Sequence, residues 1–68
     1  MDRITLKAAR VNAGLTQGKA AAELGISNKT LSAWENGTRV PDISMIEPIC
    51  KLYGRTYDSI IFLPNNPL

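Results

Sequence analysis

Residues 17–36, QGKAAAELGISNKTLSAWEN, decide how this chain of 68 residues folds. The pattern predicts two short helices joined by a tight turn at Gly25, because glycine readily adopts the positive φ that such a turn requires. Ile26 then plugs the gap between the two helices. Ser27 is a residue type preferred at the N-cap of the second helix. The other helices must therefore pack around a pair whose geometry is set within this stretch.

Apolar residues at three- and four-residue spacing continue the pattern in both directions. Thr5 and Thr16 are suited to cap the first and second helices, and Gly14 is suited to end the first. Residues 40–42 form an extended connection, since a residue before proline avoids the helical region. The expected helices cover about residues 5–13, 17–24, 28–36, 44–53 and 57–63, with a coil tail at 64–68. The sequence therefore predicts a single all-α domain of five helices over residues 1–68.

The start of the fourth helix is open to two interpretations. If Asp42 is the N-cap, Pro48 falls inside the helix and should kink it. We favour a start at Ser44, which would form a capping box with Glu47 and place Pro48 just past the first turn, or else a bent helix. The buried face of this helix is expected to comprise Ile43, Ile46, Ile49 and Leu52.

The composition argues against catalysis. With one cysteine and no histidine, the chain can form neither an internal disulfide nor a structural zinc site. Cys50 lies in the apolar run IEPICKL and is interpreted as a buried thiol, because no imidazole is present to activate it as a nucleophile. The sequence has no phosphate loop and no pair of acids placed for general acid–base catalysis. We therefore expect no enzyme, no cofactor, no metal site and no small-molecule substrate.

Charge and hydropathy narrow the range of partners. The formal net charge is +2 and the sequence pI is about 9.0, which alone is weak evidence for nucleic acid. The distribution of charge along the chain is stronger evidence, because Glu35 is the only acidic residue between Ser27 and Arg39. No apolar run is long enough to span a bilayer, and the N-terminus has no secretory signal. We therefore expect a cytoplasmic protein without a membrane partner.

The expected helix at residues 28–36 has one face suited to contact bases. At about 100° per residue, its small and polar residues share an arc of about 140°, whereas Leu31 and Trp34 lie on the other side. Asparagine can pair bidentately with adenine, lysine can donate to guanine, and a serine or alanine allows close approach. The alternative is an ordinary solvated face. The residues of the arc are Asn28, Lys29, Ser32, Ala33 and Asn36.

A specific combination of residues extends over nearly the whole chain. It consists of Arg10, Leu15-Thr16-Gln17, Ala21, Leu24-Gly25-Ile26-Ser27, Leu31-Ser32, Trp34-Glu35-Asn36-Gly37 and Pro41. This combination resembles the phage-repressor family of helix-turn-helix proteins, which is of the Cro and lambda-repressor (XRE) type. The resemblance runs from Leu6 to about Leu63. It implies five α-helices and sequence-specific binding of double-stranded DNA, usually as a dimer on a palindromic operator.

By this resemblance, three sets of residues have expected roles. The positions that approach base edges are Asn28, Lys29, Ser32 and Ala33. The positions that contact DNA phosphates are Gln17, Asn36, Thr38 and Arg39. The positions of an ion pair between the first and third helices are Arg10 and Glu35. The alternative for this last pair is two independent surface charges, which would contribute little to stability.

Two features depart from the family pattern. Gly18 and Ala20 replace larger or better helix-forming residues in the second helix, which leaves its packing thinner. Gly18 also costs that helix about 1 kcal/mol relative to alanine, and the sequence offers no reason for it. Pro48 interrupts the fourth helix, which in relatives can contribute to dimer contacts.

We expect a homodimer, because one domain of this size makes few base contacts. A twofold dimer would place two recognition helices one turn of DNA apart, about 34–36 Å. The segment YDSIIFL at residues 57–63 is interpreted as a short helix from its context, although its β-branched residues also fit a strand. Its apolar residues either close the core or also form the dimer interface, and we expect a shared role. The interface residues are expected to be Tyr57, Ile60, Ile61, Phe62 and Leu63.

The sequence thus predicts a transcriptional regulator of phage or mobile-element type. Bound over a promoter, its dimer would block polymerase and act as a repressor. We expect no ligand-binding domain, so regulation would come from concentration, competition for DNA or a second regulatory protein. Two alternatives use the same fold. One is the antitoxin of a toxin–antitoxin pair, and the other is a protein-interaction module without DNA binding, against which the side chains of Asn28, Lys29 and Ser32 argue.

Overall fold

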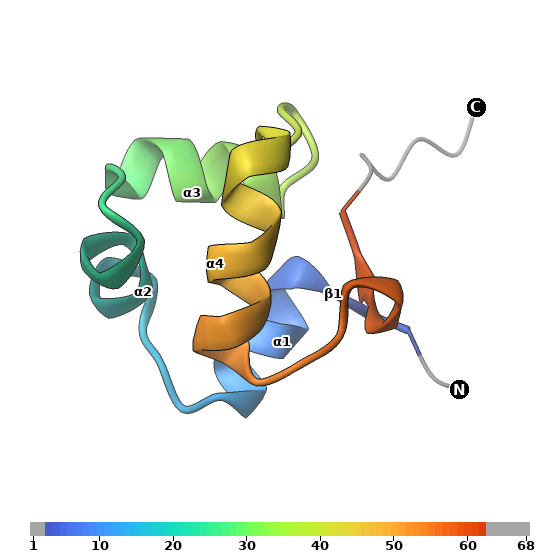
Figure 1. The fold of residues 1–68 in the computed structure, drawn as a ribbon. Helices are drawn as coiled ribbons and strands as arrows, with labels where there is room; N and C mark the ends of the chain where they lie inside the picture. The colour runs from blue at the N-terminus through green and yellow to red at the C-terminus, as the bar shows by residue number, and fades with distance from the viewer. Residues whose placement is uncertain (1–2, 63–68) are drawn as a thin grey trace.

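The computed structural model describes residues 3–62, which form four α-helices, one 3-10 turn and a two-stranded sheet (Figure 1). In chain order the elements are β1 (Ile4–Thr5), α1 (Leu6–Asn12), α2 (Gln17–Leu24), α3 (Asn28–Glu35), α4 (Ile43–Tyr53), η1 (Tyr57–Ser59) and β2 (Ile60–Ile61). The helix α4 packs against α1 and α2, while the pair α2 and α3 forms one side of the molecule. The expected bounds of α2 are confirmed.

Side-chain caps begin the first three helices, as the sequence predicts. The hydroxyls of Thr5, Thr16 and Ser27 each accept a hydrogen bond of 3.1 Å from the backbone N–H three residues later. Each bond satisfies one of the N–H groups that a helix start leaves without an intrahelical partner. Gly25 ends α2 in the left-handed conformation, with φ of 74°, so that α3 can begin only three residues further on.

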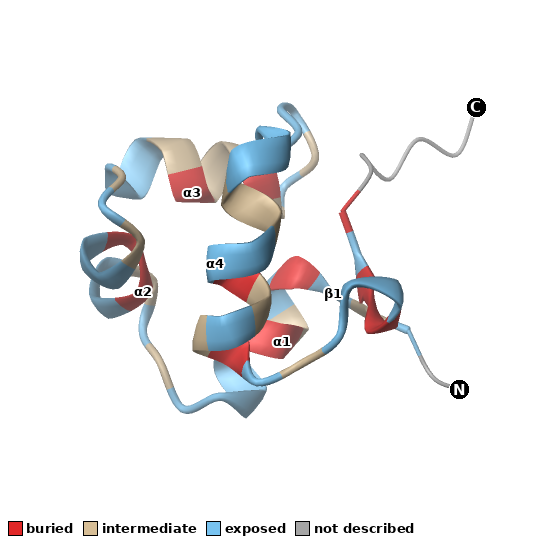
Figure 2. Ribbon diagram, in the orientation of Figure 1, coloured by how far each residue is buried: buried red, intermediate tan, exposed pale blue. Residues whose placement is uncertain are grey.

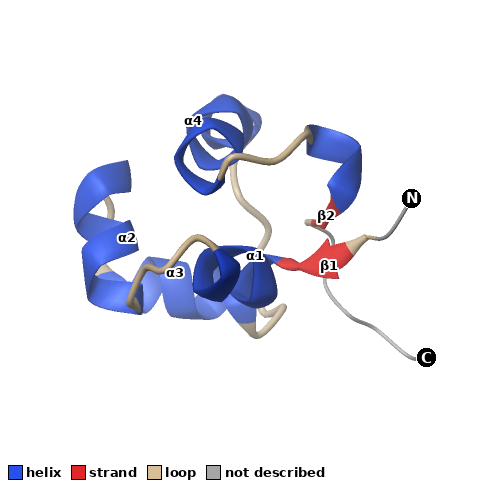
Figure 3. Ribbon diagram, turned by 90° about the horizontal axis from the view of Figure 1, so that it is seen from below, coloured by secondary structure: helices blue, strands red, loops and turns tan. Residues whose placement is uncertain are grey.

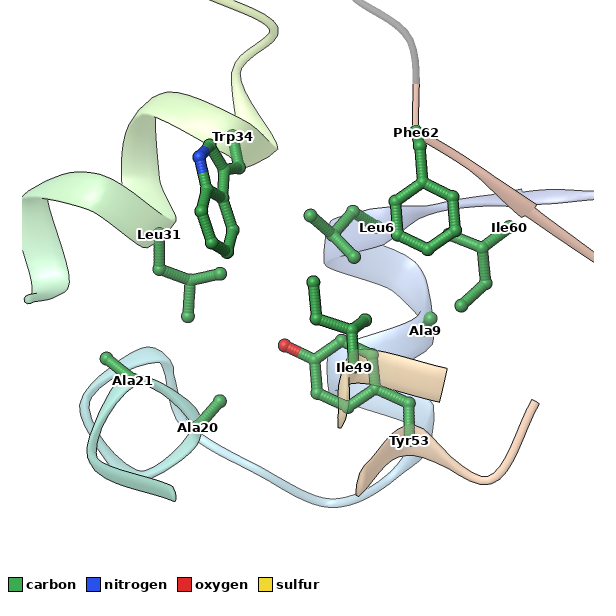
Figure 4. Packing of buried hydrophobic residues seen from close by; sticks show 10 residues of the cluster. All are labelled: Leu6, Ala9, Ala20, Ala21, Leu31, Trp34, Ile49, Tyr53, Ile60 and Phe62. Carbon is green, nitrogen blue, oxygen red and sulfur yellow. The ribbon is translucent and has the colours of Figure 1, made fainter. Parts of the chain in front are cut away.

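The core is built from the inward faces of all these elements (Figure 2). Leu31 and Trp34 project from α3 into the interior, where Ile49 enters from α4 (Figure 4). Ala20 and Ala21 are fully buried and small, which lets α2 pack closely below α3. Burial of a side chain the size of Leu31 stabilises a fold by about 1.5–3 kcal/mol. The orientation of α3 is therefore fixed by its apolar side.

The expected fifth helix over residues 57–63 is wrong. After the single turn η1 the chain becomes extended, and Ile60 pairs with Ile4 in a parallel register (Figure 3). The β-branched isoleucines suit this strand, and β1 supplies the hydrogen-bonding partner that a lone segment lacks. The expected helix count of five is thus corrected to four within residues 3–62. Leu63 and the expected coil tail lie outside the described residues.

The turn before β2 is held by Ser59, whose buried hydroxyl donates to the Thr56 carbonyl oxygen at 2.8 Å and accepts from Arg55 Nε at 3.2 Å. These two bonds use the polar groups that would otherwise be buried without partners. They end η1 after one turn and direct the chain into the strand. Ile60 is then only 1% exposed, which fixes the register of the pair β1 and β2.

The favoured start of the fourth helix is also wrong. The N-cap is Asp42, although its side chain makes no capping hydrogen bond, and α4 continues through Pro48. Proline lacks the N–H that would bond to the carbonyl of Ser44, and both residues lie on the exposed side of the helix. Ile43, expected on the buried face, is 91% exposed because it begins the helix beyond the edge of the core. Cys50 is a half-buried free thiol, and burial raises its pKa.

Candidate nucleic-acid interface

The helix α3 presents to solvent the edge that the sequence assigns to base contacts. Asn28 and Lys29 follow the Ser27 cap directly and are exposed at the start of the helix. Ser32 and Ala33 lie one turn further on and are half-buried. Figure 2 shows this outer edge in exposed and intermediate colours above the buried positions that face the core. The structure therefore gathers the four positions on one accessible edge of α3.

A buried ion pair fixes α3 against α1. Arg10 Nε donates to Glu35 Oε2 at 2.6 Å, and Arg10 Nη2 donates to Glu35 Oε1 at 3.2 Å. The two side chains are only 9% and 5% exposed. This bidentate hydrogen bonding is the main cause of the raised pKa of Arg10. The guanidinium also donates from Nη1 to the Leu15 carbonyl oxygen at 2.8 Å, which ties the pair to the loop before α2.

Two further residues adjoin this pair. Gln17 donates from Nε2 to Glu35 Oε1 at 3.2 Å, so the first residue of α2 is linked to the last residue of α3. The hydroxyl of Tyr53 is buried and has no hydrogen-bond partner among residues 3–62. Burial and the nearby charge of Glu35 raise the pKa of Tyr53 to about 12.

An open depression lies where α1, the start of α2 and the end of α3 meet. Its lining residues are Lys7, Arg10, Thr16, Gln17, Ser32, Glu35 and Asn36. The structure thus brings Gln17 and Asn36, two of the expected phosphate contacts, to the same concave surface as Ser32. Lys7 was missed by sequence reasoning, although it lies one helical turn before Arg10 and therefore shares its face of α1. The depression also contains the positive end of the α2 dipole, which favours anions.

The loop after α3 is shaped by Asn36 and Thr38, two of the expected phosphate contacts. The backbone N–H of Thr38 donates to the Ala33 carbonyl oxygen at 3.0 Å and to Asn36 Oδ1 at 3.2 Å. The Thr38 hydroxyl lies 2.9 Å from the same Asn36 oxygen. These bonds leave the Nδ2 donor of Asn36 free. Arg39 is exposed and makes no ion pair with any other residue of the described range.

The C-terminal apolar residues divide between the core and the surface. Ile60 and Phe62 are 1% and 8% exposed, so these two residues of the segment close the monomer's own core. Tyr57 and Ile61 are exposed, and Leu63 lies outside the described residues. The Tyr57 ring stacks on Phe62 with its centroid 5.7 Å away, which leaves its other side open.

An apolar groove of about 520 Å³ lies between the start of α4 and η1. Its lining residue Ile43 was expected on the buried face of the fourth helix, because it continues the apolar spacing of α4, but it is exposed together with Val40. Tyr57 lines the opposite side. Arg3 and Asp58 also border the groove but do not form an ion pair with each other. In the sequence, the only indication of this groove was the pair of aliphatic residues that flank Pro41-Asp42.

Among residues 3–62, no group of three or more Asp, Glu, Cys or His side chains is arranged to hold a metal ion. Within the same range, every helix is too short or too polar to traverse a bilayer.

Comparison with known proteins identifies the class. A helix-turn-helix family profile matches residues 6–60, and the chain therefore belongs to the helix-turn-helix family. The resemblance drawn from the sequence is confirmed. Over 56 residues the chain is 39% identical to the HTH-type transcriptional regulator ImmR of Bacillus subtilis (strain 168). The aligned region covers 82% of this chain and 44% of ImmR. The chain thus spans less than half the length of this curated relative. No solved structure gives a significant match.

Proposed function

We propose that this protein is a transcriptional repressor that binds a pseudo-palindromic operator in double-stranded DNA as a homodimer. The observation that carries the proposal is the accessible edge of α3, held outward by the burial of Leu31 and Trp34 and by the Arg10–Glu35 ion pair. A helix with one side fixed in the core and the other side rich in hydrogen-bonding groups fits the major groove, which is wide enough to admit it.

Asn28 and Lys29 are the proposed main base contacts, because they are exposed at the N-terminal end of α3. In helix-turn-helix proteins this end of the recognition helix enters the groove first. An asparagine amide can pair with adenine N6 and N7, and a lysine ammonium can donate to guanine O6 and N7. Ser32 and Ala33 are half-buried and have short side chains, so they would contact a base edge or a thymine methyl only where the helix lies close to the bases.

The phosphate contacts are proposed to flank these bases on both sides. Gln17 has one amide hydrogen bonded to Glu35 and a second one available to a phosphate oxygen, beside the first N–H groups of α2. On the other side, Asn36 keeps its Nδ2 donor and Arg39 its whole guanidinium. Thr38 would act mainly through the loop that it stabilises. Such contacts set the register of the protein on the duplex and make binding depend on salt.

We place the dimer interface on the apolar groove beside α4. Val40, Ile43 and Tyr57 are large apolar side chains that line the groove and are left exposed by the monomer. In a twofold interface each residue that contacts a partner residue is contacted in return, so Arg3 of one protomer can pair with Asp58 of the other and the reverse. The same face thus offers apolar area and matched charges to a second copy. Of the five interface residues expected from the sequence, Tyr57 is the one that both lines this groove and is exposed.

Repression would follow from occupancy of DNA. A dimer bound across a promoter excludes polymerase from the same face of the duplex, with no need for a second domain. The mobile-element type of regulator is supported by the family resemblance. In a reporter strain, expression from a promoter that overlaps the operator should fall when the protein is produced. Expression from the same promoter with a scrambled operator is the control.

Selection of bound sequences from a random pool of DNA duplexes tests the proposal. We expect enrichment of two inverted half-sites whose centres are about 10–10.5 base pairs apart, the spacing of two recognition helices on one face of DNA. The variant Asn28→Ala/Lys29→Ala serves as the control and should enrich a degenerate pool. No enrichment by the wild type at low ionic strength would exclude sequence-specific binding, and enrichment of a single unpaired site would exclude the twofold dimer.

A further inference from the structure

Gly18, which the sequence left unexplained, lies directly beside Asn28. It is the second residue of α2 and is exposed. A methyl group added to its Cα would lie 3.7 Å from Asn28 Nδ2 and 3.8 Å from Asn28 Oδ1. The amide end of Asn28 therefore lies beside the first turn of α2, next to the Cα of Gly18.

Neither the backbone nor the packing of the monomer requires this glycine. Gly18 is not among the glycines with positive φ, so other residues can adopt its conformation. A methyl group would meet Asn28 at ordinary van der Waals distance, and alanine is the better helix former. The feature that glycine does provide is empty space next to the Asn28 amide. Any side chain longer than alanine would begin to fill that space.

We propose that Gly18 is a specificity-determining residue that positions Asn28 by leaving its amide free to turn toward a base. This inference rests on the proposed function, in which α3 reads the major groove. Bidentate pairing of an amide requires its nitrogen and its oxygen to face one base edge together. A γ carbon at position 18 would displace the amide from the side of α2, and one of the two hydrogen bonds would be lost.

Gly18→Leu tests the proposal, with Gly18→Ala as the matched control. The affected base pair is found first, as the operator position at which Asn28→Ala abolishes discrimination. Dissociation constants are then measured for the selected operator and for duplexes altered at each position. We expect Gly18→Leu to reduce discrimination at that base pair at least fivefold, which is the lower end of the range that a bidentate pair provides. Discrimination at the other positions should stay within twofold of the wild type. Gly18→Ala should keep the wild-type preference.

The same substitution in an Asn28→Ala background separates positioning from a general structural effect. Without the amide, Gly18→Leu should cause no further change in discrimination at any base pair. An equal loss at all base pairs, or a loss that persists in the Asn28→Ala background, would overturn the proposal. So would full retention of discrimination by Gly18→Leu, or by Gly18→Gln, which carries the same γ carbon with a polar end. If the wild type itself shows no preferred operator, the proposed function fails instead.

Discussion

Two regions of the molecule differ in polarity and in whether the monomer satisfies them. One is the junction between α1 and α3, and the other is the groove between α4 and η1. The junction is polar and buried, and Arg10 and Glu35 find their partners inside the monomer. The groove is apolar and open, and Ile43 and Tyr57 are 91% and 65% exposed. The first region holds the proposed recognition helix in one orientation. The second leaves apolar area for another molecule. Perturbing the junction should therefore unfold the monomer, whereas perturbing the groove should affect association alone.

The largest effect is expected from Glu35→Ala. Removal of the carboxylate leaves the Arg10 guanidinium buried without its counter-charge, which typically destabilises a protein by about 3–5 kcal/mol. Chemical denaturation monitored by Trp34 fluorescence measures this change in the free energy of unfolding. Glu47→Ala, which removes an exposed acid on α4, is the matched control and should change stability by less than about 0.5 kcal/mol. Equal stability of the two variants would exclude a structural role for the pair.

The groove is tested by Ile43→Glu. The side chain is exposed in the monomer, so the free energy of unfolding should stay within about 0.5 kcal/mol of the wild type. A charge in an apolar dimer interface should nevertheless abolish self-association and weaken binding to the full operator more than tenfold, which is about 1.4 kcal/mol. Sedimentation and equilibrium binding measure the two effects.

Val11→Glu is the control for this prediction, because Val11 is an exposed apolar residue of α1 that does not line the groove. It should leave the dimer intact. A dimer that survives Ile43→Glu and Tyr57→Glu together would place the interface elsewhere.

A more specific effect is expected at the proposed DNA contacts. Lys29→Ala should cost about 1–3 kcal/mol of specific affinity and relax the preference at particular base pairs. Arg39→Ala is its matched opposite, since both remove one exposed cation. It should weaken binding to all sequences alike and reduce the slope of affinity against salt by about one. A shift of base preference in Arg39→Ala would move that residue from the phosphates to the bases.

The sequence predicted best where structure is decided locally. The caps at Thr5, Thr16 and Ser27 and the turn at Gly25 need only their own neighbours, and each was predicted correctly. The fold of the last segment was mispredicted because the partner of Ile60 is Ile4, at the opposite end of the chain. No local pattern records that pairing.

The candidate interface was only partly accessible to sequence reasoning for a similar reason. Apolar spacing placed Ile43 in the core, but spacing does not show where a core ends along a helix. Lys7 lies in the depression beside Gln17 only because α1 and α2 meet there. The family pattern named the residues of α3, and the structure supplied what surrounds them, including the contact between Asn28 and Gly18.

The smallest effect is expected at Tyr53, on the inner side of the junction. Its pKa is raised to about 12 by burial and by Glu35, so the folded state holds the phenolic proton more tightly than the unfolded state does. The resulting contribution to stability is complete below pH 10 and should be lost between about pH 10 and pH 12. Tyr53→Phe should remove this alkaline loss of stability. At pH 7 the variant should match the wild type or exceed it slightly, since the hydroxyl has no partner within residues 3–62.

Titration of the isotope-labelled protein with its selected operator, followed by NMR, tests the central claim most directly. We expect the side-chain amide of Asn28 and the backbone signals of Lys29, Ser32 and Ala33 to shift most. Signals of Ile43 and Tyr57 should not respond to added duplex when the dimer is already saturated. Large shifts around the α4 groove with the signals of α3 unchanged would contradict the assignment of α3 as the helix that reads DNA.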